Sequence, residues 1–165
     1  MVNLEVAFNM KGDFSVNSTQ THTTLVSTAE HSQHPLRRAF QWGYFSIASL
    51  FVLCVLFQVF MAGAGILVTG FWLGLHASFG YFIVLIPLLL LLPLSLLGGF
   101  PRFINWLNVL LALLALAQPM LLWHLGLPII AALHPVNALL IFVLPLFLLS
   151  RVWGLLNKKQ KERDQ

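Results

Sequence analysis

Charged residues are almost absent from the middle of this 165-residue chain, and that absence limits the folds open to it. Between Ala39 and Ser150 the only Asp, Glu, Lys or Arg is Arg102, which separates an uncharged run of 63 residues (39–101) from a second of 48 (103–150). A helix that crosses a bilayer takes about 20 apolar residues. Each run therefore has room for two such helices and the loop between them.

We predict an all-α fold, a four-helix transmembrane bundle. The composition agrees, because 59% of the residues are hydrophobic and 8% are charged, whereas a soluble domain has roughly 25% charged residues. The first 36 residues are rich in Ser, Thr, Asn and Gln and cannot bury a core, so we expect a disordered tail there. The predicted domains are a polar tail (1–36), the four-span domain (37–156, with spans near 40–63, 75–97, 103–123 and 130–150) and a basic tail (157–165).

The positions of the basic residues predict how the chain is oriented. They lie before the first span, between the second and third spans, and after the fourth, whereas the loops near 64–74 and 124–129 contain none. Cytoplasmic loops carry an excess of Lys and Arg, so we expect both termini in the cytoplasm and a multi-pass protein of the inner (cytoplasmic) membrane. The basic charge is explained by this topology, so the expected partner is the lipid bilayer and no nucleic acid.

Polar side chains inside the spans are costly and therefore informative. His76 begins the second span and His134 begins the fourth, each a few residues from the outer interface, so their depths in the membrane are similar. His124 ends the third span beside Trp123, where an interfacial position is expected. Apart from hydroxyls and from Gln41 at the expected cytoplasmic edge, the polar side chains within or at the ends of the spans are Gln58, His76, Asn105, Asn108, Gln118, His124, His134 and Asn137.

The two predicted hairpins resemble each other. His76 follows Gln58 by 18 residues, and His134 follows Gln118 by 16. This spacing suggests a parallel repeat of two helical hairpins, related by an axis along the membrane normal. Such an axis would place His76 and His134 opposite each other across the bundle.

Two opposed histidines in a four-helix bundle are a suitable ligand set for a b-type haem, because imidazoles can bind its iron from both faces. We therefore predict His76 and His134 as ligands of the haem iron. Gln58, Gln118, Asn137 and His124 are the predicted supporting residues, since a ligating histidine usually donates its other N–H to an acceptor. The resulting hypothesis is a haem-binding or redox-associated bundle that exchanges electrons with a redox or membrane-complex partner.

The alternative is a cofactor-free structural or accessory membrane subunit. In that case the histidines would hydrogen-bond across helices to Gln58, Gln118 or Asn137. Glycines near the site, including Gly65 and Gly80, fit both hypotheses, because they would leave space for a flat macrocycle or let helices approach closely. No intramembrane carboxylate, HExxH motif or nucleophile–base motif occurs, so we assign no catalytic residue and do not expect an enzyme. A permease is disfavoured because one four-helix chain leaves little room for a pathway.

Three segments resemble a known family. FQVFMAGAG (57–65), LHASFGYF (75–82) and AALHPVNALLIF (131–142) are similar, in that order, to a family of small four-helix bacterial membrane proteins of unknown function. The similarity covers about residues 39 to 150, and LHPVNALL is its most specific part. It implies a four-span inner-membrane protein with His76 and His134 at family-like positions, and it implies no activity.

A fainter similarity is to haem-handling membrane proteins of the haem A synthase type. It consists of a Gln near the end of one helix, a Gly-rich segment, and the pair Leu75-His76 at the start of the next helix. The acidic catalytic residue of such enzymes has no counterpart here, because no Asp or Glu lies within the spans. The similarity therefore argues against catalysis and leaves haem binding open.

Overall fold

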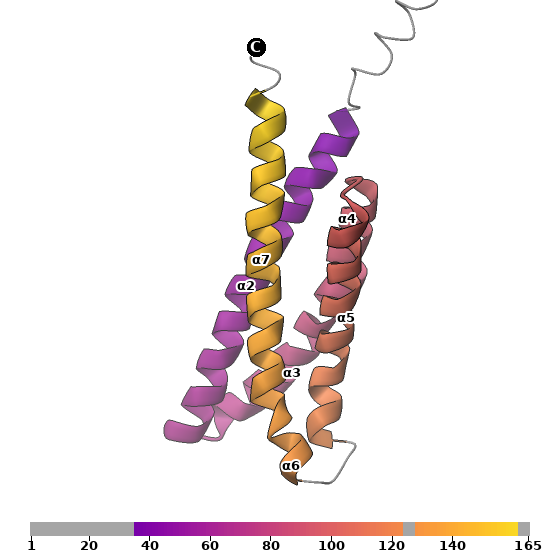
Figure 1. Ribbon diagram of the computed structural model, residues 1–165. Coiled ribbons are helices and arrows are strands. Elements are labelled where there is room, and N and C mark those ends of the chain that lie inside the picture. Colours follow the sequence, from indigo (N-terminus) through magenta and orange to yellow (C-terminus); the bar gives the residue numbers. More distant parts are fainter. Residues whose placement is uncertain (1–34, 124–127, 162–165) are drawn as a thin grey trace, which may run out of the picture. The chain divides into compact units, whose positions relative to one another are not determined.

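A computed structural model describes residues 35–123 and 128–161, and these two ranges are helical except at short turns (Figure 1). Four stretches are long and apolar enough to cross a membrane: Pro35–Leu67, Phe71–Leu97, Arg102–Leu122 and Ile129–Lys158. The predicted four-helix transmembrane bundle is thus confirmed. The helices are α2 (Pro35–Leu67), α3 (Phe71–Ile86), η1 (Pro87–Leu91), α4 (Leu92–Leu97), α5 (Arg102–Trp123), α6 (Pro128–Ala131) and α7 (Leu133–Lys161). Residues 1–34 of the predicted tail (1–36), the end of the chain from 162 and His124 lie outside the described residues.

The second span is one helix whose hydrogen-bond spacing changes in the middle. Helix α3 passes into the π-helical turn η1 and then into α4. The cause is Pro93, which lacks an N–H and cannot bond to the carbonyl four residues earlier. In the residue before it, the N–H of Leu92 donates to the carbonyl of Pro87, which is five residues back and not four. Such π-turns are common next to functional positions, and this one separates α3 from α4.

The turn between α4 and α5 is held by side chains of α2. Gly99 has a φ of 61°, in the left-handed region that glycine adopts without strain. Arg37 donates from Nε to the carbonyl of Gly98 (3.1 Å) and from Nη2 to that of Gly99 (2.6 Å). The side chain of Gln41 donates to the same Gly98 carbonyl at 2.8 Å. These bonds satisfy carbonyls at the end of the second span and tie it to the first.

We expect Gly99→Ala to lower the free energy of unfolding by about 1–3 kcal/mol, because an L side chain is strained at positive φ. An added Cβ would also lie 2.5 Å from the Arg37 guanidinium. The matched control is Gly154→Ala, since a Cβ at Gly154 of α7 meets nothing within 4 Å. Thermal unfolding in detergent should show a lower midpoint for the first variant only. Equal midpoints for the two would contradict the role assigned to Gly99.

The tightly packed core lies in the half of the bundle that contains this turn. Tyr44 and Phe51 of α2, Leu111 of α5 and Leu148 of α7 are all fully buried there. The Tyr44 hydroxyl donates to Oδ1 of Asn108 at 3.0 Å, and Asn108 donates to the carbonyl of Ile104 at 2.9 Å. A buried amide in an apolar core is stable only when it is paired in this way.

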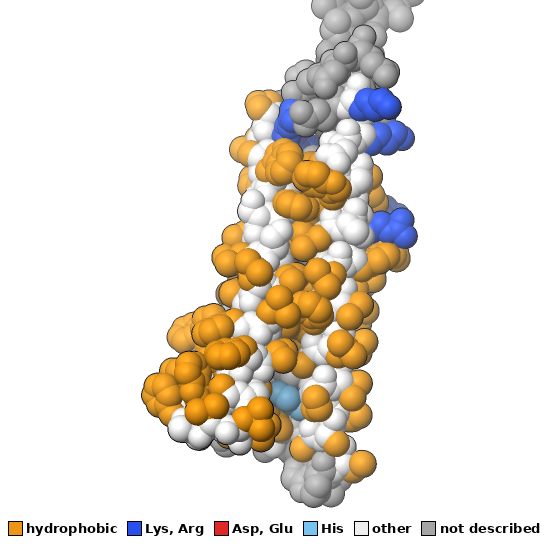
Figure 2. Space-filling view, turned by 90° about the vertical axis from the view of Figure 1, so that its left-hand side faces the viewer, with side chains coloured by type: hydrophobic (Ala, Val, Ile, Leu, Met, Phe, Trp, Pro, Cys, Tyr) orange, Lys and Arg blue, Asp and Glu red, His pale blue; other side chains and the backbone are white. Residues whose placement is uncertain are grey.

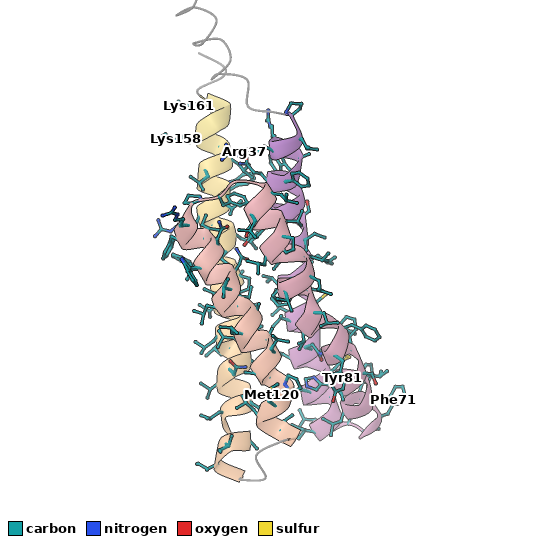
Figure 3. All side chains as sticks on the ribbon, turned by 90° about the vertical axis from the view of Figure 1, so that its right-hand side faces the viewer. Arg37, Phe71, Tyr81, Met120, Lys158 and Lys161 are labelled. Carbon is teal, nitrogen blue, oxygen red and sulfur yellow. The ribbon has the colours of Figure 1, made fainter. Side chains whose placement is uncertain are left out.

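The outer surface is apolar along the spans and basic at one end. Many large hydrophobic side chains are exposed on every span, as expected where lipid replaces water. Figure 2 shows this apolar surface, with the Lys and Arg side chains gathered towards one end. Arg37, Lys158 and Lys161 lie at that end, and Phe71 and Met120 lie towards the opposite end (Figure 3). Along the described spans the charge is therefore segregated as the sequence predicted.

Candidate functional site

The first hairpin brings Gln58 of α2 and His76 of α3 together through two reciprocal hydrogen bonds. Nε2 of Gln58 donates to the backbone carbonyl of His76 at 3.1 Å. Nδ1 of His76 lies 3.0 Å from the backbone carbonyl of Gln58. A carbonyl has two lone pairs, so it can accept such a bond in addition to its helical one. We call Gln58 and His76 the first half-site.

The second hairpin repeats this arrangement. Nε2 of Gln118 in α5 donates to the carbonyl of His134 in α7 at 3.1 Å, and Nδ1 of His134 lies 3.1 Å from the carbonyl of Gln118. Asn137, one helical turn after His134, donates to Oε1 of Gln118 (2.5 Å) and to the carbonyl of Leu114 (2.8 Å). We call Gln118, His134 and Asn137 the second half-site. The two half-sites support the interpretation of the hairpins as a repeat.

The two half-sites meet at their histidines. The ring centres of His76 and His134 are 6.3 Å apart and the ring planes are inclined by 65°. Both side chains are half-buried, and Figure 2 shows a histidine side chain at the surface between helices, in the half of the bundle away from the basic end. The structure therefore brings together the two histidines that the repeat predicted to be opposite each other.

The hydrogen bonds place a proton on Nδ1 of both rings. A carbonyl oxygen can only accept, so Nδ1 of His76 and of His134 is the donor. In the neutral form of this tautomer, Nε2 keeps its lone pair. Among the described residues neither Nε2 has a hydrogen-bond partner. A fixed Nδ1–H bonded to a carbonyl is the usual orientation of a histidine that ligates a metal through Nε2.

The predicted supporting residues Gln58, Gln118 and Asn137 lie at the site, but their contacts differ from the predicted hydrogen bonds between their side chains and the imidazoles. The acceptors for the histidines are the backbone carbonyls of Gln58 and Gln118, and the side-chain amides of these residues contact the histidine backbones instead. Asn137 contacts Gln118 and not His134. His124 lies outside the described residues, so its predicted supporting role stays a prediction.

Two glycines near the site allow close packing. A Cβ on Gly80 would lie 2.8 Å from Nε2 of Gln58, and a Cβ on Gly65 would lie 2.5 Å from the side chain of Leu73. The space beside each glycine is therefore filled by a neighbouring side chain. Of the two hypotheses for these glycines, the structure favours close approach of the helices.

The donor set restricts the kind of metal centre that the pair could hold. The part of the chain that the structure describes contains no group of three or more His, Cys, Asp or Glu side chains. A metal ion bound by these residues alone would thus have two protein ligands at this place, fewer than the usual structural or catalytic zinc site has. A macrocycle that supplies four nitrogens needs only two axial ligands from the protein.

Two polar contacts at the basic end were not predicted from the sequence: that of Tyr44 with Asn108 and that of Arg37 with the α4–α5 turn. Asn108 stood among the intramembrane polar residues without a partner, because Tyr44 lies 64 residues away in the sequence. Arg37 is one of the basic residues before the first span from which the orientation was predicted, and its guanidinium also binds the α4–α5 turn. The positive charge next to a Gly-Gly helix end was the signal that could have indicated this contact.

The four spans and the paired histidines define the class: a multi-pass helical membrane protein with a polar site built from two hairpins. Over residues 58–126 the chain matches DUF6220, a family of unknown function. No curated protein and no solved structure matches. The match agrees with the resemblance to an uncharacterised family of small helical membrane proteins.

The matched range contains Gln58, His76 and Gln118 and ends before His134. The segment LHPVNALL, the most specific part of the resemblance, thus lies outside the match. The similarity to haem A synthase-type proteins receives no support from the comparisons.

Proposed function

We propose that this protein is a b-type haem-binding, redox-associated membrane bundle in which His76 and His134 ligate the iron from opposite faces. The distance between the two imidazoles carries the proposal. An imidazole–metal bond is about 2 Å long, so the ring centres of two imidazoles on opposite sides of one metal ion are about 6 Å apart. The observed separation is 6.3 Å. The 65° inclination is compatible, because each ring is free to turn about its own bond to the metal.

The tautomer supports the same proposal. Both Nδ1 atoms are bonded to the carbonyls of Gln58 and Gln118, so Nε2 of each ring is the nitrogen available to bind a metal. When bound, haem would supply a one-electron redox centre within the bilayer. The residues of the chain hold the two rings in one tautomer and shield part of the site from water. Half-buried rings leave one side of the site open to lipid or to a membrane partner.

The orientation belongs to the same proposal. Basic residues gather towards one end of the described spans, and we propose that this end faces the cytoplasm of a bacterial inner membrane. The histidine pair would then lie nearer the extracytoplasmic side. Electrons would pass between a partner on that side, or a quinone, and the membrane.

The test is a difference absorption spectrum, dithionite-reduced minus oxidised, of the detergent-purified full chain expressed with haem supply. We expect the sharp bands of a low-spin, six-coordinate haem at one haem per chain. Circular dichroism of the same sample reports whether the protein is folded. A helical, monodisperse protein without haem bands would refute the proposal.

One observation favours a second candidate, a cofactor-free accessory membrane subunit. The reciprocal bonds between Gln58 and His76 and between Gln118 and His134 tie helices together without any cofactor. Interhelical bonds of this type contribute about 0.6–2 kcal/mol each. A helical protein without haem bands would favour this candidate.

A further inference from the structure

The two half-sites share their reciprocal hydrogen bonds but differ at one position. The residue three places after His134 is Asn137, and the residue three places after His76 is Phe79. Asn137 donates to Oε1 of Gln118 at 2.5 Å. Phe79 has no donor to offer, and Oε1 of Gln58 is buried without a hydrogen-bond partner among the described residues.

This difference makes the first half-site the weaker one. The Gln118 amide is bound at both ends, by the carbonyl of His134 and by Asn137, and Asn137 is itself anchored on Leu114. The Gln58 amide is bound only through Nε2. A buried acceptor without a donor costs free energy that a rearrangement can recover. Each histidine takes part in two hydrogen bonds, so the half-sites differ in how firmly the glutamine beside each histidine is held.

The packing of the two helices points the same way. Ile83 is the only buried residue of α3, the helix that carries His76. After α3 the span continues through the π-helical turn η1. Helix α7, which carries His134, contributes Ile141, Leu148, Val152 and Leu156 to the buried core. A displacement of His76 would therefore disturb less packing than a displacement of His134.

We infer that His134 is the anchoring ligand of the pair and His76 the displaceable one, so that the first half-site is where a small neutral ligand such as carbon monoxide reaches the iron. This inference rests on the proposed haem function. The exchange replaces the Nε2 lone pair of His76 by the lone pair of the incoming molecule, and no electron or proton is transferred. Asn137 is a positioning residue that acts on His134 through Gln118.

The first part of the test compares His76→Ala with His134→Ala in the full chain, by haem content and by carbon monoxide binding to the reduced protein. His76→Ala should keep haem in a five-coordinate form that binds carbon monoxide at once. His134→Ala should retain haem at least about tenfold more weakly, since the loss of a ligand costs at least as much as the loss of an outer-shell partner. Equal haem retention by the two variants would overturn the inference.

The second part exchanges the residues that differ. Phe79→Asn gives Gln58 a donor, and we expect it to slow carbon monoxide binding to the reduced protein about five- to tenfold, the effect of one added hydrogen bond at a buried group. Asn137→Leu removes the donor that Asn137 offers to Oε1 of Gln118, and it should not slow carbon monoxide binding. An unchanged rate in a haem-loaded Phe79→Asn protein would also overturn the inference.

The outcomes separate the two proposals. Wild-type protein that is folded but free of haem refutes the proposed function and this inference together. Wild-type protein with low-spin haem, combined with equivalent histidine variants, refutes the inference alone. Phe79 also packs against the ring of Phe57, so Phe79→Asn removes a packing contact and can affect folding. The comparison of the two alanine variants does not depend on that variant.

Discussion

Substitution of both His76 and His134 by alanine is expected to remove all haem from the purified protein, and either single substitution is expected to abolish the six-coordinate, low-spin spectrum. The reason is the proposed haem site, in which the two Nε2 atoms would be the ligands of the iron because both Nδ1 atoms are bonded to backbone carbonyls. The measurement is the reduced-minus-oxidised difference spectrum together with the ratio of haem to protein.

The matched control is His34→Ala, which removes a histidine from the polar N-terminal tail predicted from the sequence and should leave the spectrum unchanged. The fold must be followed in parallel, because each imidazole also makes an interhelical hydrogen bond through Nδ1. The loss of these bonds should lower the thermal midpoint by a few degrees, since a bond of this type contributes about 0.6–2 kcal/mol. A low-spin spectrum that survives in the double variant would assign the haem to other ligands.

The fold could be predicted from the sequence because one physical quantity dominates it. A charge placed between Ala39 and Ser150 would be costly in lipid, so the charged residues mark the ends of the spans directly. The helices are longer than the predicted spans, as for Pro35–Leu67 against 40–63. A helix does not have to end where the hydrocarbon ends, since water and headgroups also tolerate it.

The histidine pair could be predicted from the spacing of Gln58, His76, Gln118 and His134, since a repeat places equivalent residues at equal depth. The details of the hydrogen bonds could not. The sequence does not show whether a glutamine contacts a ring or a backbone carbonyl, because both lie within reach of one side chain. The difference between Asn137 and Phe79 acquires meaning only when Oε1 of Gln118 is seen to be paired and Oε1 of Gln58 is not.

A large side chain at Gly80 is expected to disable the first half-site selectively. A Cβ at this position of α3 would already lie 2.8 Å from Nε2 of Gln58, so Gly80→Leu must push the amide away from the carbonyl of His76. Overpacking of this kind costs about 1–3 kcal/mol. The loss of the Gln58 contact should also release His76, so that the six-coordinate, low-spin spectrum is lost while haem stays bound through His134.

Gly74→Leu is the control, because Gly74 lies on the same helix and a Cβ there meets nothing within 4 Å. Both substitutions add the same side chain and the same helix propensity, so a difference between them reports the contact with Gln58. The reduced-minus-oxidised spectrum of the two purified variants reports the coordination of the iron, and thermal unfolding measures the packing cost. If both variants keep the low-spin spectrum of the wild type, Gln58 does not position His76. If Gly80→Leu alone loses the low-spin spectrum while both variants remain helical, the contact between Gly80 of α3 and Gln58 of α2 is required for the site.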